Sequence, residues 1–336
     1  MTKPWEEDDK QFGKVIKRAK RKTWIRNILI SLVASIVAIT LVQFGALQLT
    51  YRAGDKALNE EWLHMTMTSP NEYESGYKNQ TGFLSGTLEF SSYKIVEGVP
   101  VPWGSRMAEY KVPGFLKFTG LSGNIGNVTV VDPDMKAKNY MYYRPYNASN
   151  GQRELMFYVP GVDYNGKIVN DLDLVGKMGA NKAAEMAISF DKDYSLDEVR
   201  AMLPGEVTPV WYWVDTFDNR ETFNFKPYKD ERGETSYPTP MTKTFGVYGF
   251  GVRPDWEQVE VKDFLQDLQF GLKQKGRYTK EYERINNYLK KDKQQPDESD
   301  VRLLGVVVTG TAEELQALRG QSYVRAAALG AVTETY

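Results

Sequence analysis

The chain of 336 residues contains no cysteine and only one histidine, His64. The lack of cysteine excludes disulfides, cysteine-ligated zinc or iron–sulfur sites and thiol nucleophiles. A single histidine excludes multi-histidine metal sites and leaves one base at most for Ser-His-Asp catalysis. Because His64 stands alone, we interpret it as a solvated or packed side chain. Carboxylates are plentiful, but no grouping suggests a paired-acid hydrolase, so we expect no metal, no cofactor and no enzymatic activity.

Charge is missing from one stretch and unevenly divided over the rest. Residues 28–51 carry no Asp, Glu, Lys or Arg, whereas residues 1–27 hold nine basic and four acidic side chains, a net charge of +5. The remainder carries a net charge of −6, so the near-neutral total of −1 conceals a strong asymmetry. Such an asymmetry around an apolar stretch is a signal of membrane topology.

The uncharged stretch predicts a transmembrane helix over residues 28–49. At about 1.5 Å per residue, about 20 helical residues cross a hydrocarbon core of about 30 Å. Trp24 and Tyr51 flank the run, where aromatic rings favour the interface. The alternative is a cleaved signal peptide, but its apolar core is shorter, and Phe44 occupies a position where the cleavage site needs a small residue. The basic cluster before the run predicts a cytoplasmic N-terminus and an extracytoplasmic remainder.

The cytoplasmic segment, residues 1–27, has the pattern of an amphipathic helix. Pro4 suits the first helical position, and four acidic residues follow it where the helix dipole is positive. One apolar stripe recurs at helical spacing along the segment. Its members, our candidate contact residues, are Trp5, Phe12, Val15, Ile16 and Ala19.

Two interpretations of this stripe stay open at the level of composition. The segment is either a juxtamembrane helix on the lipid surface or a docking helix for a cytoplasmic partner, with Trp5 and Phe12 as anchors. The acidic start favours docking to a small degree, since anionic lipid repels it.

Residues 50–160 predict a membrane-proximal, β-rich region. A polar stretch runs from 52 to 78. Within it the helix is expected to continue over 57–63, and Ser69-Pro70-Asn71 ends this helical part. Short β-type runs broken by turn residues follow it; these are 86–90, 115–118, 128–131, 139–143 and 154–159. A glycine-rich stretch at 120–126 lacks the Lys-Ser/Thr of a phosphate loop and is interpreted as a turn.

Residues 161–336 predict a C-terminal domain that contains an internal repeat. Strand patterns at 186–190 and 303–308 are each followed by a capping box, Ser195-x-x-Glu198 and Thr311-x-x-Glu314, and then by a second strand. Two strand–helix–strand units of similar length suggest a split βαβ, ferredoxin-like unit. An insertion at about 215–300 separates them and contains two helices, at about 255–275 and 279–291. The predicted fold class is therefore α+β.

The order of these parts resembles the sigma factor regulator family of Firmicutes, the YhdL-like membrane-anchored anti-sigma factors. In the N-terminal part the resemblance lies in Phe12-Gly13-Lys14-Val15-Ile16-Lys17-Arg18-Ala19-Lys20 and in 87–103. In the C-terminal part it lies in 154–158, 186–195 and 210–215. These motifs are aromatic and structural and are not catalytic.

The resemblance implies a function that composition does not show. The cytoplasmic end would hold an extracytoplasmic-function sigma factor at the membrane, and the outer domain would respond to the envelope and release it. No direct contact with nucleic acid is implied. Because 27 residues make a small sequestering element, membrane lipid and a second small membrane protein are further candidate partners. The alternative is an envelope binding or assembly protein whose N-terminal anchor sets only its topology.

Overall fold

The computed structural model describes residues 4–116, 128–138, 142–223, 226–236, 246–252 and 259–335, with side chains from residue 12 onward. The chain forms two compact units. The first comprises Met1–Gly54, Thr81–Gly86 and Tyr110–Gly120, and the second comprises Asp55–Gln80, Thr87–Glu109 and Leu121–Tyr336. The predicted glycine-rich turn at 120–126 lies outside the described residues.

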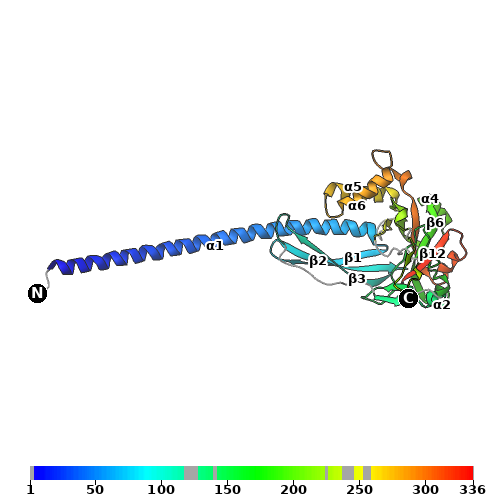
Figure 1. Ribbon diagram of the computed structural model, residues 1–336, viewed down its shortest axis with the longest axis horizontal. Coiled ribbons are helices and arrows are strands. Elements are labelled where there is room, and N and C mark those ends of the chain that lie inside the picture. Colours follow the sequence, from blue (N-terminus) through cyan, green and yellow to red (C-terminus); the bar gives the residue numbers. More distant parts are fainter. Residues whose placement is uncertain are drawn as a thin grey trace. The chain divides into compact units, whose positions relative to one another are not determined.

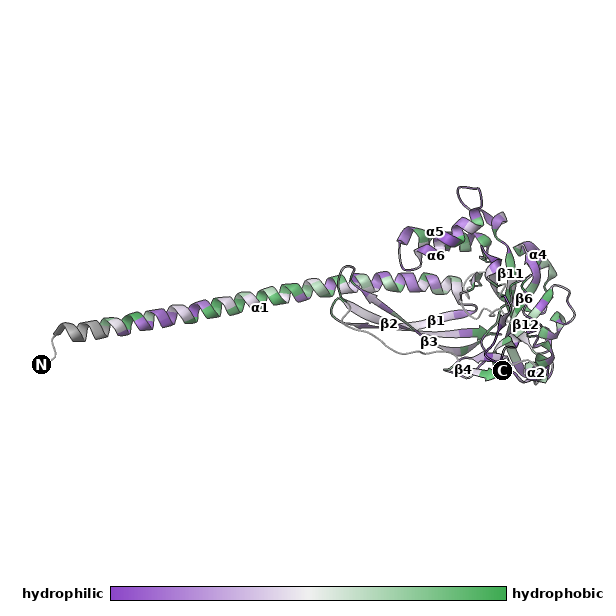
Figure 2. Ribbon diagram, viewed as in Figure 1, coloured by the Kyte–Doolittle hydropathy of each residue, from purple (hydrophilic) through white to green (hydrophobic). Residues whose placement is uncertain are grey.

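One helix, α1 (Pro4–Thr68), accounts for the whole N-terminal part of the chain (Figure 1). It begins at Pro4, as the sequence predicts, and ends just before Asn71, whose φ of 51° is left-handed. The described part, Phe12–Thr68, is long and apolar enough to cross a membrane. Figure 2 shows the hydrophobic residues concentrated in the middle of α1. The helical continuation predicted to residue 63 is correct and extends five residues further.

A three-stranded sheet follows α1, in the order β1 (Glu72–Thr81), β2 (Ser85–Val96) and β3 (Val99–Lys111). The end of the polar stretch at 52–78 forms β1, a strand that the sequence pattern does not predict. Its seven C-terminal residues are exposed, so the strand lacks the apolar alternation that would have marked it. Along β2 buried residues recur at every second position through much of the strand, as expected of a half-buried strand.

Small elements connect this sheet to the C-terminal domain. The strand β4 (Val128–Val131) pairs with β5 (Tyr143–Tyr146), and α2 (Pro133–Ala137) lies between them behind its N-cap, Asp132. The helix α3 (Leu172–Val175) follows. The strand expected at 115–118 is wrong for its described residues, Phe115 and Leu116, which lie outside any strand.

The run at 154–159 is buried, but it forms no strand, which corrects the sequence prediction. Side chains instead of a neighbouring strand satisfy part of its backbone. The N–H of Tyr158 donates to Ser189 Oγ at 2.9 Å, and the N–H of Val159 donates to Tyr164 Oη at 2.9 Å. The apolar composition of residues 154–159 therefore indicates that the run is buried, but it does not indicate whether the run forms a strand.

The C-terminal domain contains a five-stranded sheet in the order β10-β7-β11-β6-β12, with antiparallel neighbours. The first of the two predicted strand–helix–strand units comprises β6 (Lys182–Tyr194), α4 (Leu196–Met202) and β7 (Thr208–Val214). The second is β11 (Leu303–Thr311), the 3-10 helix η3 (Glu314–Leu318) and β12 (Val324–Glu334). Both predicted capping boxes are present.

The two strand–helix–strand units interleave in the five-stranded sheet. Since neighbouring strands are antiparallel, β6 and β7 run in the same direction with β11 between them, and β11 and β12 do so with β6 between them. Each unit is thus split by a strand of the other, which is the arrangement of a split βαβ. The α+β fold class is confirmed, while the description as ferredoxin-like stays an interpretation.

The insertion adds an edge strand and a helix pair. After the 3-10 helix η1 (Arg220–Phe223) and the two-residue strands β8 (Tyr228–Lys229) and β9 (Thr235–Ser236) comes β10 (Tyr248–Gly251), which extends the sheet beyond β7. The helices α5 (Val261–Gln274) and α6 (Thr279–Lys290) match the two predicted helices, and the 3-10 helix η2 (Glu298–Asp300) leads into β11.

Both faces of this sheet are buried. The strand pleat sends Ile188 and Val306 into one apolar cluster, with residues of α4, α5 and α6. It sends Ala187 and Val307 into another, with Trp213 and the segment 155–169. The strands consequently read as continuous apolar runs instead of alternating ones.

Candidate functional site

The predicted contact residues lie on α1, ahead of its uncharged segment. We call Phe12, Val15, Ile16 and Ala19 the N-terminal apolar face. Helix geometry of about 100° per residue places them on one side, and all four are exposed, Phe12 by 70%. Trp5 lies in α1 as well, but its side chain is outside the described residues. That this face binds a partner stays a prediction.

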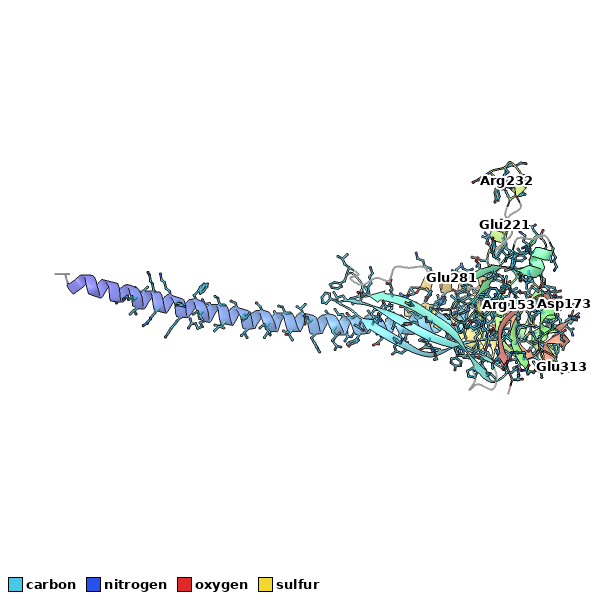
Figure 3. All side chains as sticks on the ribbon, turned by 90° about the horizontal axis from the view of Figure 1, so that it is seen from below. Arg153, Asp173, Glu221, Arg232, Glu281 and Glu313 are labelled. Carbon is cyan, nitrogen blue, oxygen red and sulfur yellow. The ribbon has the colours of Figure 1, made fainter. Side chains whose placement is uncertain are left out.

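The uncharged segment, residues 28–49, continues α1 with nearly all of its side chains exposed. Figure 3 shows side chains projecting around this helix. Water disfavours a helix with apolar side chains exposed on every side, whereas a lipid bilayer gives these side chains apolar surroundings. The segment therefore indicates a single-pass membrane protein.

The last two turns of α1, residues 61–68, have a different environment. We call them the C-terminal turns of α1. Leu63 and Met67, four residues apart on one face, are 2% and 1% exposed and belong to the apolar cluster that holds Phe264 and Leu268 of α5. The C-terminal turns are therefore a core element of the second compact unit.

Polar contacts join the same turns to the α5–α6 connection. Glu61, 2% exposed, accepts hydrogen bonds at its Oε1 from Arg277 Nη1 at 2.6 Å and from Tyr278 Oη at 2.8 Å. The N–H of Arg277 donates to Glu60 Oε2 at 3.2 Å. Gly276 permits this approach, because a Cβ there would lie 2.4 Å from the Glu60 carboxyl. A charged carboxylate at this depth is stabilised by these charge-assisted bonds.

His64 packs within this group and is only partly exposed to solvent. Its ring stacks on Tyr278 with centroids 3.7 Å apart and planes 5° apart. Burial, followed by the positive charges of Arg106 and Arg277, lowers the pKa of His64 to about 4. Its Nδ1 has no hydrogen-bond partner among the described residues. The histidine is therefore neutral at pH 7, with an unfavourable environment for a proton.

A buried ion pair joins the three-stranded sheet to the five-stranded sheet. Lys94 on β2 and Glu185 on β6 are 3% and 0% exposed, and Lys94 Nζ lies 2.9 Å from Glu185 Oε2. Asn71 Nδ2 donates to Glu185 Oε1 at 3.0 Å, and the N–H of Ala331 donates to Oε2 at 3.2 Å. Lys94 also lies over the ring of Trp103, 4.3 Å from its centroid. Each charge is thus paired and hydrogen-bonded, as burial demands.

A cavity of about 440 Å³ lies beside the C-terminal turns of α1. Trp62 and Met65 of α1, Tyr73 of β1 and Trp211 of β7 contribute to its wall, as does Asn71. Tyr73 Oη donates to the Val252 carbonyl at 2.8 Å, and burial raises the pKa of Tyr73 to about 12. The cavity has the size of a small-molecule pocket and brings α1, β1 and the β7–β10 edge around one space.

Potential metal ligands do not cluster in the described part of the chain. No three residues among His, Cys, Asp and Glu gather there as metal ligands would. Each buried acid of the described residues has a basic side chain as a hydrogen-bond donor; these acids are Glu61, Asp132, Asp171, Glu185, Asp215 and Asp300.

Comparison with protein families defines the class. The model described as sigma factor regulator N-terminal matches residues 13–101, and the model described as sigma factor regulator C-terminal matches residues 175–331. Together the two matches cover more than half of the chain, so the chain belongs to the sigma factor regulator family. No curated protein and no solved structure gave a match.

Family membership supports an anti-sigma factor role, with a sigma factor as the bound partner and a regulatory rather than an enzymatic activity. The N-terminal match includes Val15, Ile16 and Ala19 and continues through the uncharged segment, the C-terminal turns of α1, all of β1 and β2, and the first residues of β3. The C-terminal match covers the five-stranded sheet and the α5–α6 pair.

Sequence reasoning missed the polar groups that hold the second unit together. Three of these groups, Glu61, Lys94 and Glu185, lie on α1, β2 and β6, and Arg277 lies in the α5–α6 connection. No neighbour in sequence indicates the partner of any of them. One available signal was Glu185, a single acid inside the apolar run 183–190. An ionisable side chain in a buried strand calls for a partner of opposite charge.

Proposed function

We propose that this chain is a single-pass membrane anti-sigma factor whose cytoplasmic segment, residues 1–27, sequesters an extracytoplasmic-function sigma factor. The observation that carries the proposal is the N-terminal apolar face, which is helical, exposed and directly ahead of the membrane segment. An apolar stripe with i, i+3, i+4 and i+7 spacing is the pattern with which helices dock into hydrophobic grooves. Trp5 lies seven residues, or about two helical turns, before Phe12 and extends the stripe.

The orientation in this proposal follows from the basic residues of the segment. Lys and Arg between residues 14 and 26 keep short segments on the cytoplasmic side. The membrane-proximal region, residues 50–160, and the C-terminal domain, residues 161–336, then lie outside and receive the envelope signal.

The route from signal to sigma factor in this proposal is α1 itself. Its C-terminal turns are part of the core of the second unit, so a rearrangement there changes the packing of Leu63 and Met67. The Lys94–Glu185 pair couples the membrane-proximal region to the C-terminal domain, so the two respond together. The cavity beside Trp62 and Met65 is where a small signal molecule would act on the helix end.

Membrane lipid and a second small membrane protein complete the proposed partners. The basic residues flanking the N-terminal apolar face suit anionic headgroups. A second membrane protein would enlarge the surface that 27 residues offer to a sigma factor, since stable interfaces bury about 800 Å² per partner.

The test is a pair of variants on opposite faces of α1. Trp5→Ala with Phe12→Ala removes the two aromatic anchors, and we expect sigma-dependent reporter transcription to rise severalfold while the membrane abundance of the protein is unchanged. Lys14→Ala, about 200° from Phe12 around the helix, is the matched control and should leave repression intact. Full repression by the double variant would contradict the docking face.

A second experiment separates the alternative function. Affinity purification of the detergent-solubilised chain should recover a sigma factor, and deletion of residues 1–23 should abolish that recovery. Recovery of envelope proteins alone, unchanged by the deletion, would instead favour an envelope binding or assembly protein with a purely topological anchor.

A further inference from the structure

An apolar contact is made on α1 near the end of its uncharged segment, within the first compact unit. Two turns form it, one between β1 and β2 and one after β3. Leu84 from the first turn and Val112 from the second are 5% and 6% exposed and pack with Ala46 of α1, which is 8% exposed. The N–H of Val112 donates to the Leu84 carbonyl at 2.9 Å and joins the two turns.

The position of Ala46 sets the level of this contact along α1. Ala46 lies within the uncharged run 28–49, three residues or about 4.5 Å of helix before its end. If residues 28–49 cross the bilayer, whatever packs on Ala46 lies at the depth of the membrane boundary. The two turns therefore reach the lipid.

Side chains next to these contacts are apolar and exposed. Phe115 and Leu116 follow the second turn and are 48% and 76% exposed, and Phe83 in the first turn is 51% exposed. Aromatic and aliphatic side chains grouped at the end of a membrane helix match the composition of the interfacial region.

Backbone geometry shows that this arrangement is held in place. Leu84 has a φ of 55°, a left-handed conformation that a leucine adopts only where packing compensates for its cost. Here the compensation comes from its contact with Ala46 and Val112. Gly114, with a φ of 83°, allows the second turn to bring Phe115 back, where its N–H donates to the Val112 carbonyl at 3.3 Å.

We propose that Phe83, Phe115 and Leu116, which we call the lipid rim, insert into the outer leaflet and form a second membrane contact beside α1. The occupant is the lipid bilayer, because the rim is continuous with the apolar surface of the membrane segment. This inference requires α1 to span the membrane and does not depend on a sigma factor.

The absence of cysteine makes a direct depth measurement possible. Single-cysteine variants Leu116→Cys, Phe115→Cys and Phe83→Cys of the full chain would carry a fluorophore in phosphatidylcholine–phosphatidylglycerol vesicles. Lipids with a nitroxide near the headgroup quench labels at that depth. Leu47→Cys on α1 is the membrane reference, and Tyr228→Cys, between charged residues of the insertion, is the aqueous control.

We expect labels at 115 and 116 to be quenched within twofold of the label at 47, and at least fivefold more than the label at 228. Quenching at the level of Tyr228→Cys would overturn the proposal, and so would a blue-shifted emission without quenching, which would indicate contact with a second copy. Because Leu116 is so exposed, Leu116→Cys should keep the thermal midpoint of the parent and remains informative if Phe115→Cys folds poorly.

Discussion

The two ends of α1 have similar apolar side chains in opposite surroundings. At the N-terminal apolar face, Phe12 and Val15 are exposed. At the C-terminal turns, Leu63 and Met67 are buried among residues of α5, and Glu61 is held by Arg277 and Tyr278. The first arrangement is an exposed apolar surface, which we propose as a docking face, and the second is a structural element of the second compact unit. One helix can thus belong to the core at one end and carry an exposed apolar face at the other.

The difference between the two ends of α1 predicts that almost all of the stability of the folded chain comes from the second compact unit. The largest loss of stability is expected from breaking the buried Lys94–Glu185 ion pair of that unit. Lys94→Met leaves Glu185 charged and without its counter-ion, so we expect a loss of about 3–5 kcal/mol in the free energy of unfolding. Denaturant unfolding followed by tryptophan fluorescence measures it. Lys78→Met is the matched control on β1, because the exposed Lys78–Glu89 pair, at 3.7 Å, is worth less than about 1 kcal/mol.

Two outcomes refine this prediction. Adding Glu185→Leu to Lys94→Met should recover much of the loss, because no unpaired charge then remains buried. Equal costs for Lys94→Met and Lys78→Met would show that the ion pair does not hold the two sheets together.

The second prediction concerns the attachment of α1 to the α5–α6 connection. Glu61→Ala removes the acceptor of Arg277 and Tyr278, and we expect a loss of about 2–3 kcal/mol in the free energy of unfolding. Glu61→Gln keeps one acceptor oxygen and should lose about half as much. Thermal unfolding of both variants measures the difference, and an unchanged midpoint for Glu61→Ala would remove this contact from the account of how α1 is held.

The third prediction is a pH dependence with a defined sign. The pKa of His64 is about 4 in the folded chain and 6.5 ordinarily, so the unfolded state binds the proton more tightly. Stability should therefore fall as pH decreases from about 6.5 and level off below about 4. Because His64 is partly solvated, we expect roughly 1–2 kcal/mol. His64→Phe keeps an aromatic ring against Tyr278 and should lack this part of the pH dependence.

The smallest effect on stability is expected at the other end of α1. Phe12→Ala should change the free energy of unfolding by less than about 0.5 kcal/mol, since little burial is lost. Leu63→Ala, the same kind of truncation at the buried end, should cost about 2–5 kcal/mol. Thermal unfolding of the pair tests the comparison directly. A large loss for Phe12→Ala would mean that the N-terminal apolar face is a packing surface of this chain.

Local signals predicted the elements that depend on local physics. Pro4 begins α1, and Ser195 and Glu198 form the capping box of α4, because both positions are decided by backbone groups within one helical turn. The run 154–159 was misassigned as a strand, since apolar composition reports burial and not the source of hydrogen bonds. In the structure, Ser189 and Tyr164 supply two of those bonds from elsewhere in the chain.

The residues of the candidate site also differ in whether the sequence could predict them. Phe12, Val15, Ile16 and Ala19 could be named from helical spacing alone, and the structure confirms that they are helical and exposed, while their partner stays a prediction. The environment of His64 could not be named, because Tyr278 and Arg277 lie more than 200 positions away in sequence. A packed, neutral histidine and a solvated one look the same in sequence.

The amino-acid sequence by itself determined the membrane segment, the N-terminal apolar face, the charge asymmetry and the repeated strand–helix–strand units. Each of these depends on the period of apolar residues, on capping or on charges along one stretch. Only the tertiary structure decided that α1 continues into the core of the second unit, that Lys94 meets Glu185, and that Leu84 and Val112 pack on Ala46. These contacts join residues far apart in the chain, so their energies depend on the folded arrangement and leave no periodic trace.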